Sequence, residues 1–389
     1  MAQKKQVLFV CYGLGIGGIE KCLVNLLNTL PEDTYDADLL VMDPIYDMLP
    51  QIRRNIHMVD PFEYTFNTEI TMQEIRKRGG IVKHLDKLLP YLQHRVRIKL
   101  GLPLWTQFKP IEKEYDIAVA YSQNGNGPYY VADKIRAKRK VLWYHNGIYE
   151  STGKAYARDR EYYGKFDTIV TVSQDCRAML REKFPEHSQK IMVLHNICDV
   201  RDIQRKAGAF VPDSFSAGIC HIVTVGRLSG EKGIFLVLEA CRILREQGFR
   251  FCWHWVGDGP QMEETKTAIK RGGLESCLRL EGSQINPYPY IAQADIYVQP
   301  SGYEAYSTTV TEARVLLRPM VVTDVGGMHD QLKPGRTGLI VPVTAGAIAE
   351  GVGRLLEDTQ LRASFTAALQ EEAIDSQREF AEYERTVFR

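Results

Sequence analysis

The sequence predicts an α/β fold with two domains of similar size, and three observations support this. The chain has 389 residues, which is longer than a chain that folds around a single hydrophobic core usually is. Short apolar runs alternate with glycine-rich or polar turns and with helical patterns, as in parallel sheets covered by helices. This pattern starts a second time at His221. We therefore expect a first domain over 1–197, a linker over 198–217, a second domain over 218–365 and a final helix over 366–389.

The composition excludes several classes of protein. It is 44% hydrophobic and 25% charged, which is typical of globular proteins, and the formal charge of +1 argues against general nucleic-acid binding. The eight cysteines occur singly with no C-x-x-C pair, so we expect reduced core thiols. The first residues lead directly into a strand with no apolar segment of signal-peptide or membrane-spanning length, which predicts a cytoplasmic protein.

Apolar runs in the first half are expected to form a parallel sheet. They lie at 6–11, 37–42, 56–59, 115–121, 140–144, 167–172 and 191–194. Four glycines follow the first run within 12–20, and such glycines let the backbone come close to a ligand. His145 directly follows the run at 140–144, at the carboxyl end of a strand, where α/β proteins place their sites. A lone histidine is more often structural, but this position makes His145 a candidate site residue.

The segment 71–110 differs from its surroundings in charge, with nine lysines and arginines against two acidic residues. An apolar stripe runs between these cations, at positions 85, 88, 89, 92, 96 and 100. A basic amphipathic segment can lie on an anionic membrane surface, and Trp105 nearby is compatible with a place at that interface. The alternative is a solvated helix whose stripe packs on its own domain.

The turn after the first strand of the second half carries two cations, Arg227 and Lys232, beside glycines and before a helical pattern over 234–247. Cations and backbone N–H groups in this arrangement can hold a diphosphate. The alternative is an ordinary surface loop with two charges.

The stretch 300–313 places two glutamates, Glu304 and Glu312, on either side of a run of hydroxyl residues. This run is Ser307, Thr308 and Thr309. It follows a buried strand pattern over 294–299 and precedes a helix expected over 310–317, capped near Ser307. The first N–H groups of that helix, around the hydroxyl run, would favour an anion.

These glutamates resemble the paired glutamates of retaining nucleotide-sugar glycosyltransferases of the GT-B fold, most closely glycosyltransferase family 4. The resemblance implies two Rossmann-like domains facing across a cleft, with the last helix returning to the first domain. It implies that Glu312 binds the ribose hydroxyls of the donor and that Glu304 lies against the donor sugar. The family usually has glycine where this chain has Ala305.

Further motifs carry the same resemblance. The run Gly17-Gly18-Ile19-Glu20 resembles the family's G-G-x-E loop, which implies that Gly17 and Gly18 lie at the cleft near the donor phosphate. Arg227 and Lys232 match a pair that neutralises the leaving diphosphate, and His145 matches a histidine that contacts the donor sugar.

Two later turns extend the resemblance to the rest of the donor site. Gly257 belongs to a V-G-x-G-P-like turn that lines the approach to the donor. Gln284 and Ile285 lie in the stretch whose backbone meets the nucleotide base in relatives. Most relatives use UDP-sugars, so the resemblance favours a UDP-sugar as donor and a lipid-linked or cell-surface glycan precursor as acceptor.

The expected reaction is sugar transfer to an acceptor hydroxyl with retention of configuration and without a cofactor. No aspartate triplet or His/Cys cluster in the sequence offers a metal cage, and no D-x-D lies where a Mg²⁺-dependent transferase would need it, so we expect no metal. Arg227, Lys232 and the helix start at 307–309 would then meet the charge on the leaving phosphate. No carboxylate is placed as a nucleophile, so the resemblance favours front-face attack, in which the departing phosphate takes the acceptor proton.

Three alternatives remain open at this point. The first is a catalytically silent partner subunit that binds a nucleotide or a membrane. The second is a GT-B enzyme of another reaction, such as an epimerase or a phosphorylase. The third keeps the transfer but uses a soluble acceptor, which follows if the segment 71–110 is only part of its domain; otherwise that segment would hold the protein at the inner face of the membrane.

Overall fold

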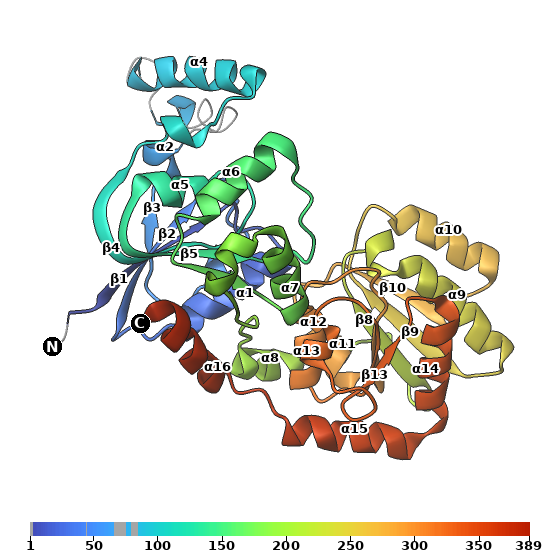
Figure 1. Ribbon diagram of the computed structural model, residues 1–389. Helices are drawn as coiled ribbons and strands as arrows, with labels where there is room; N and C mark the ends of the chain where they lie inside the picture. Colours follow the sequence, from blue (N-terminus) through green and yellow to red (C-terminus); the bar gives the residue numbers. More distant parts are fainter. Residues whose placement is uncertain (1–2, 44, 66–74, 79–84) are drawn as a thin grey trace. The chain divides into compact units, whose positions relative to one another are not determined.

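The computed structural model describes residues 3–43, 45–65, 75–78 and 85–389, and the chain divides into two compact units (Figure 1). Unit 1 contains the chain up to Val172 together with Cys176–Ile197 and Gln377–Arg389. Unit 2 contains Ser173–Asp175 and Cys198–Ser376. Each unit has its own parallel sheet and its own helices, which confirms the predicted fold class.

The sheet of unit 1 has seven strands in the order β3-β2-β1-β4-β5-β6-β7, and its pairs are parallel. The strands are β1 (Lys5–Cys11), β2 (Tyr35–Val41), β3 (His57–Val59), β4 (Ile111–Ala120), β5 (Ile135–Tyr144), β6 (Thr168–Thr171) and β7 (Ile191–Val193). The helices are α1 (Gly18–Thr29), α2 (Pro61–Tyr64), α4 (Leu85–Leu100), α5 (Gly127–Lys134), α6 (Gly153–Tyr163), α7 (Gln174–Lys183) and α16 (Ser376–Tyr383). The order of the strands reverses between β1 and β4, and open α/β sheets bind their ligands at such a point.

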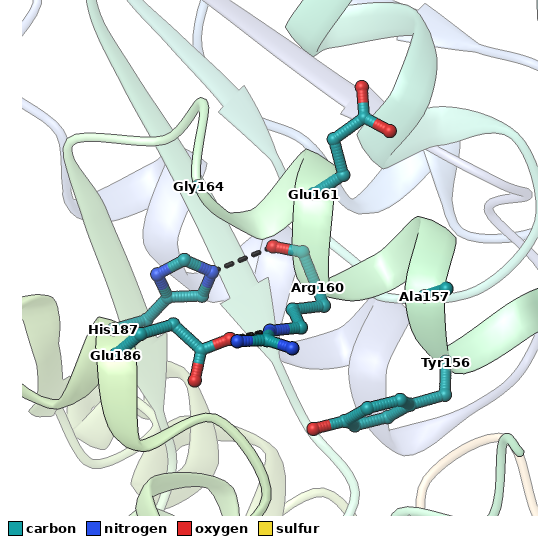
Figure 2. A pocket seen from close by; sticks show the side chains of 7 residues that line it. All are labelled: Tyr156, Ala157, Arg160, Glu161, Gly164, Glu186 and His187. Carbon is teal, nitrogen blue, oxygen red and sulfur yellow. Dashed lines mark hydrogen bonds and ion pairs between the residues drawn. The ribbon is translucent and has the colours of Figure 1, made fainter.

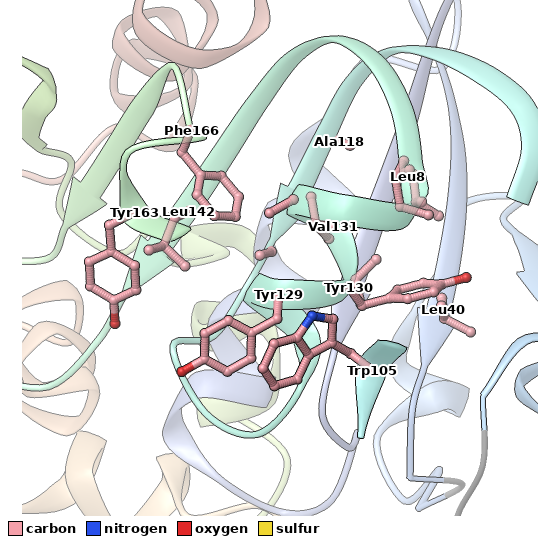
Figure 3. Close-up of a cluster of buried hydrophobic side chains, with 14 of the residues drawn as sticks. Leu8, Leu40, Trp105, Ala118, Tyr129, Tyr130, Val131, Leu142, Tyr163 and Phe166 are labelled. Carbon is pink, nitrogen blue, oxygen red and sulfur yellow. The ribbon is translucent and has the colours of Figure 1, made fainter. Parts of the chain in front are cut away.

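An apolar cluster of unit 1 lies between this sheet and α5 (Figure 3). It includes Trp105, which is only 3% exposed and stacks on Tyr129 with 4.3 Å between ring centroids. The indole N–H of Trp105 donates a hydrogen bond to Asp133 at 3.0 Å. The proposed interfacial place of Trp105 is therefore wrong, because the ring belongs to the core.

The sheet of unit 2 has six strands in the order β10-β9-β8-β11-β12-β13. The strands are β8 (Cys220–Val225), β9 (Phe251–Val256), β10 (Leu278–Gly282), β11 (Ile296–Gln299), β12 (Met320–Thr323) and β13 (Leu339–Val341). The helices are α8 (Val200–Ala207), α9 (Ile234–Glu246), α10 (Met262–Gly272), α11 (Tyr288–Gln293), α12 (Thr308–Val315), α13 (Met328–Gln331), α14 (Ala345–Glu357) and α15 (Thr359–Glu371). The order reverses between β8 and β11, which brings the turns after these two strands side by side at one edge of the sheet.

The end of the chain packs on unit 1. The ring of Phe388 contacts those of Phe9 and Tyr35, with 6.3 and 5.5 Å between centroids. The Lys5 ammonium donates a hydrogen bond to the Phe388 carbonyl at 2.8 Å, and the Tyr35 hydroxyl donates one to Glu384 at 2.8 Å.

Two boundaries differ from those that the sequence suggests. The expected linker over 198–217 lies in unit 2 and contains α8, whose N-cap Asp199 accepts a hydrogen bond from the N–H of Asp202. The returning helix begins at Ser376 rather than at 366, because α15 fills the residues before it. The eight cysteines are free thiols, seven of them buried, as expected of core residues. Among the described residues, no helix combines the length and the apolar character needed to cross a bilayer.

Candidate active site

A buried carboxylate, that of Glu304, accepts three hydrogen bonds in the loop after β11. The Lys232 ammonium donates to its Oε1 atom at 2.7 Å, the Ser301 hydroxyl at 2.8 Å and the Gln299 amide at 3.1 Å. Glu304 is 8% exposed, and the Lys232 side chain is 27% exposed. Because a buried carboxylate is costly without partners, these donors fix both its position and its orientation.

The helix α12 begins directly after this loop. Ser307 is its N-cap, as the sequence pattern predicts, and the Ser307 hydroxyl accepts a hydrogen bond from the N–H of Val310. The side chain of Gln331 holds the cap from outside: it accepts from the Ser307 N–H at 2.9 Å and donates to the Ser307 carbonyl at 2.7 Å. Thr308 lies in the first turn, half-buried beside the cap, and Glu312 is buried in the second turn, 2% exposed. These hydrogen bonds therefore fix the backbone at the start of α12.

Gln299, to which the sequence pattern assigns no role, connects Glu304 to the start of α12. The side chain of Gln299 is buried, 1% exposed. Its Nε2 atom donates a hydrogen bond to Glu304, and its Oε1 atom accepts one from the Thr309 hydroxyl at 2.9 Å. A continuous chain of hydrogen bonds therefore runs from Lys232 through Glu304 and Gln299 to the start of α12. A polar residue at the end of a strand that is otherwise apolar is the signal that could have identified it.

The turn after β8 brings Lys232 to Glu304 through a tight backbone approach. Gly233 adopts φ +84°, and a Cβ atom at this position would lie 1.9 Å from the carbonyl oxygen of Pro300. The N–H of Gly302 donates to the carbonyl of Glu231 at 2.8 Å, which joins the two loops directly. Arg227, at the other end of the turn, is exposed, and its side chain makes no hydrogen bond or ion pair within the described part of the chain.

Gly257 holds three strand ends together. It adopts φ +146°, and a Cβ atom there would lie 2.0 Å from the carbonyl oxygen of Gly226. Its N–H donates to the carbonyl of Gly282 at 2.8 Å. Beyond that strand, Gln284 donates to the carbonyl of Glu281 at 2.8 Å, and the side chain of Ile285 is fully exposed. These residues lie at the same edge of the sheet as the Glu304 loop, because they follow the carboxyl ends of β9 and β10.

Unit 1 carries the other predicted residues at the carboxyl ends of β1 and β5. Gly17 is the N-cap of α1, and a Cβ atom there would lie 2.2 Å from the carboxylate of Glu20; Gly18 is exposed. The ring of His145 is 6% exposed, and its Nε2–H donates to the Tyr121 carbonyl at 3.1 Å. Burial lowers the pKa of His145 to about 4, so the ring is neutral near pH 7 and its Nδ1 atom is a hydrogen-bond acceptor.

The buried His145 makes stability depend on pH in a defined direction. Its pKa in the folded state, about 4, lies below the ordinary 6.5, so the unfolded chain binds more protons between these values. Its contribution is full above pH 6.5, and roughly 3 kcal/mol is expected to disappear as the pH falls toward 4. Equilibrium unfolding at several pH values tests this, with His145→Gln expected to flatten the curve. Parallel curves for wild type and His145→Gln would contradict it.

A surface pocket of about 490 Å³ in unit 1 contains none of the predicted site residues (Figure 2). It is lined by Tyr156, Ala157, Arg160, Glu161, Gly164, Glu186 and His187. Arg160 forms an ion pair with Glu186, and the carbonyl of Arg160 contacts the ring of His187 at 2.7 Å. Because these polar groups interact with one another, the pocket gives no separate argument for a ligand.

The structure corrects the expectation that no His/Cys cluster could hold a metal. Ligand atoms of His221, Cys252 and His254 lie within 4.8 Å of one another, and all three residues are buried. The sequence hides this cluster, because its members are distant along the chain and only the pairing of β8 with β9 brings them together. It lies apart from the Lys232–Glu304 pair, toward the amino ends of these strands.

Comparison with known protein families gives two matches. The family described as Glycosyltransferase Family 4 matches residues 16–202, and the family described as Glycosyl transferases group 1 matches residues 219–358. Together they cover most of both units, with the boundary between them near the start of β8.

Two relatives of known activity illustrate the similarity. The N-acetylgalactosamine-N,N'-diacetylbacillosaminyl-diphospho-undecaprenol 4-alpha-N-acetylgalactosaminyltransferase of Campylobacter jejuni is 25% identical over 360 residues, which cover 91% of each protein. The alpha-D-kanosaminyltransferase of Streptomyces kanamyceticus is 31% identical over 144 residues, 36% of this chain. That second match spans about a third of the relative's length, 37%.

Solved structures share the whole architecture. Anabaena HepE in complex with UDP superposes with a TM-score of 0.71 at 18% identity, covering 98% of this chain and 100% of that protein. A glycosyltransferase from Rickettsia africae superposes with a TM-score of 0.72 at 15% identity and covers 98% of each chain. This likeness shows the fold, the two-domain arrangement known as GT-B.

Proposed function

Because this chain belongs to the glycosyltransferases that combine a Family 4 domain with a group 1 domain, we propose that it transfers a sugar from a UDP-sugar to an acceptor hydroxyl. The proposed transfer retains the anomeric configuration and needs no metal ion. The proposed acceptor is a lipid-linked or cell-surface glycan precursor. The Campylobacter relative supports this acceptor class, because its name includes a diphospho-undecaprenol carrier, and the UDP complex of HepE supports the nucleotide.

The observation that carries the proposal is the hydrogen-bonded chain from Lys232 through Glu304 and Gln299 to Thr309. It lines up a cation, a carboxylate and the start of a helix along one edge of the sheet of unit 2. The diphosphate of a nucleotide sugar would contact the Lys232 ammonium and the start of α12, and the sugar hydroxyls would contact the Glu304 carboxylate. A surface ion pair of no function would not require a 1% exposed glutamine to connect it to a helix start.

Two of the three groups that would meet the developing charge are held by hydrogen bonds before the donor binds. As the bond between the sugar and the β-phosphate breaks, negative charge grows on the phosphate, and Lys232, Arg227 and the N–H groups at the start of α12 favour that charge. Arg227 is exposed and can turn toward a bound diphosphate, whereas Lys232 is already positioned by Glu304. The stabilisation is strongest where the donors do not need to reorganise during the reaction.

Retention without a covalent intermediate is supported by the state of Glu304. Its Oε1 atom accepts hydrogen bonds from three donors, which makes the carboxylate a poor nucleophile. In the proposed step, the acceptor oxygen forms a bond to the anomeric carbon on the face from which the diphosphate leaves. The C–O bond to the phosphate breaks with its electron pair on the phosphate, and a phosphate oxygen takes the acceptor proton. His145, neutral near pH 7, would accept a hydrogen bond from a donor sugar hydroxyl.

A donor panel in the presence of EDTA tests this function. Purified protein is expected to bind or slowly hydrolyse one of a set of UDP-, GDP- and ADP-sugars, and NMR of the transfer product should show the anomeric configuration of the donor. Glu312→Gln keeps the volume of the side chain but removes the charge that would accept ribose hydrogen bonds, so donor affinity should fall roughly 10- to 100-fold. Glu350→Gln, on the exposed face of α14, is the matched control and should bind as wild type.

The outcomes separate the competing functions. Binding without transfer to any acceptor would favour the silent partner subunit, and conversion of the donor with no acceptor present would favour an epimerase. Loss of transfer in EDTA with recovery on adding Mg²⁺ would overturn the metal-independent reaction. Equal donor affinity in Glu312→Gln and wild type would remove the proposed role of Glu312.

We propose further that α4 of unit 1 docks on a membrane that carries the acceptor. Leu92, Val96 and Leu100 follow one another at helical spacing and are 52%, 56% and 63% exposed. The exposed cations Arg95 and Lys99 flank this stripe. Such a surface suits an anionic lipid interface. The rest of the basic segment, residues 71–74 and 79–84, lies outside the described residues.

Sedimentation with vesicles tests this docking. Wild type is expected to bind vesicles containing phosphatidylglycerol, and the variant Leu92→Ser/Val96→Ser/Leu100→Ser should bind at least about tenfold more weakly, because three apolar side chains no longer enter the interface. A control triple, Met192→Ser/Val211→Ser/Phe235→Ser, changes exposed apolar residues elsewhere and should bind as wild type. Wild-type protein that stays in the supernatant would instead favour a soluble acceptor.

A further inference from the structure

Two neighbouring strands of unit 2 place two imidazoles and a thiol on one face of the sheet. His221 of β8 is the parallel register partner of Cys252 of β9. His254 lies two residues further along β9, so its side chain leaves the same face as that of Cys252. The three residues are 6%, 4% and 0% exposed, in the order His221, Cys252, His254. Ligands at positions i and i+2 of one strand and opposite them on the next can converge on one point above the sheet.

The hydrogen bonds of the two imidazoles turn their remaining nitrogens toward each other. His254 donates through Nδ1 to Glu281 Oε1 at 2.7 Å, which leaves a lone pair on its Nε2 atom. The Nε2 atom of His221 lies 2.9 Å from the carbonyl oxygen of Ser216, an acceptor for an Nε2–H group. With both outer nitrogens protonated, His221 Nδ1 and His254 Nε2 face each other at 2.9 Å with lone pairs only. Two facing lone pairs need a positive charge between them, either a proton or a metal ion.

Ser216 allows either occupant. Its N–H group also contacts His221 Nε2, at 3.1 Å, and can donate to it. In that tautomer the proton of His221 lies on Nδ1 and bridges to His254. When the carbonyl of Ser216 accepts from Nε2–H instead, Nδ1 is available as a ligand. The backbone therefore satisfies His221 in the protonated bridge and in the metal-bound form.

The surroundings fit a bound metal ion. Glu281, through its hydrogen bond to His254 Nδ1, fixes the orientation of that ring, as carboxylates commonly do for metal-bound histidines. The ring of Phe215 stacks on both imidazoles, with 4.2 Å to His221 and 4.4 Å to His254 between centroids, and covers the cluster. Two imidazoles and one thiolate form a ligand set that suits Zn²⁺.

We propose that His221 Nδ1, His254 Nε2 and Cys252 Sγ bind one Zn²⁺ ion in unit 2, with water as the fourth ligand. The site is structural. It joins β8 to β9, and through Glu281 it steadies the segment that leads to Gln284 and Ile285. The ion takes no part in sugar transfer, so this proposal and the metal-independent reaction are compatible.

Zinc content and cobalt substitution test this proposal. Protein freed of metal with a chelator and then incubated with Zn²⁺ should retain about one equivalent after gel filtration and melt at a higher temperature than the metal-free protein, because an ion that binds only the folded state stabilises it. The Co²⁺-loaded protein should show a thiolate-to-cobalt charge-transfer band. Cys252→Ala should lose the band, the retained equivalent and the zinc-dependent rise in melting temperature. Cys220→Ser changes a partly exposed thiol one residue before His221 and should retain all three.

Two results would overturn the site. Wild-type protein that retains no more zinc than Cys252→Ala shows that a proton bridges the two histidines. Retained zinc in both proteins without a charge-transfer band places the ion elsewhere. Both results compare the wild-type protein with Cys252→Ala, which keeps the two histidines and their hydrogen bonds. The donor panel is run in EDTA, which already removes zinc, so its outcome does not depend on this site and the two proposals fail separately.

Discussion

Lys232→Ala is expected to lower kcat/KM for sugar transfer about 10²- to 10³-fold, the effect of removing one preorganised donor from a site of developing charge. The Lys232 ammonium lies 2.7 Å from Glu304 and is held there by the turn that ends at Gly233. Without it, negative charge on the leaving phosphate meets only Arg227 and the start of α12. Steady-state kinetics with the donor selected by the panel measures this loss. Lys266→Ala removes a surface lysine paired with Glu263 in the same unit and should leave transfer unchanged.

Nucleotide binding distinguishes two explanations of such a loss. If Lys232 contacts the diphosphate, Lys232→Ala should weaken UDP binding about tenfold or more and leave uridine binding unchanged. If Lys232 serves only to position Glu304, transfer should fall while UDP affinity stays at the wild-type value. That second result would contradict the proposed contact with the leaving group. Calorimetric titration with UDP and with uridine reads the difference directly.

Gly233→Ala is expected to destabilise unit 2 by about 4 kcal/mol and to abolish transfer. A Cβ atom would lie 1.9 Å from the Pro300 carbonyl oxygen, and the backbone at φ +84° disfavours any side chain. The two loops must separate to admit the methyl group, which moves Lys232 away from Glu304. Calorimetry should show the transition of unit 2 lowered by roughly 10 °C.

A matched glycine gives the control for this effect. Gly346 lies in the first turn of α14, and a Cβ atom there meets no atom within 4 Å. Gly346→Ala should therefore be neutral or slightly stabilising, since alanine favours a helix. If Gly233→Ala melted like Gly346→Ala and kept its activity, the close approach of the two loops would not be what positions Lys232.

Much of the fold and part of the site could be predicted from the sequence, because these features depend on local patterns. Apolar runs bounded by glycine-rich turns identified the strands, and a hydroxyl residue before a helical pattern identified Ser307 as a cap. Lys232 and Glu304 each follow a strand, and the reversal of strand order between β8 and β11 brings those two strand ends together. The sequence shows both ends but not their adjacency, which the resemblance supplied.

Other features depend on pairings that no local pattern contains. The strand β5 begins at Ile135, well before the apolar run at 140–144, because its basic first half pairs with the mostly acidic first half of β4. Lys138, for example, forms an ion pair with Asp116 at 2.7 Å. Read alone, those residues resemble a surface turn. The burial of Trp105 does not follow from the local sequence, because its stacking partner Tyr129 lies more than twenty positions away. The cluster around His254 was missed for the same reason.

The return of residues 377–389 to unit 1 has a consequence for how the chain is made. During synthesis, the ribosome releases the strands of unit 1 before it has translated the segment that covers Phe9 and Tyr35. Unit 2, nearly continuous from Cys198 to Ser376, can fold completely in that interval, since domains fold as units as they emerge. Unit 1 is therefore synthesised first but completes its folding last. Until residues 377–389 are made, Phe9 and Tyr35 lack the cover of Phe388 and can be bound by chaperones.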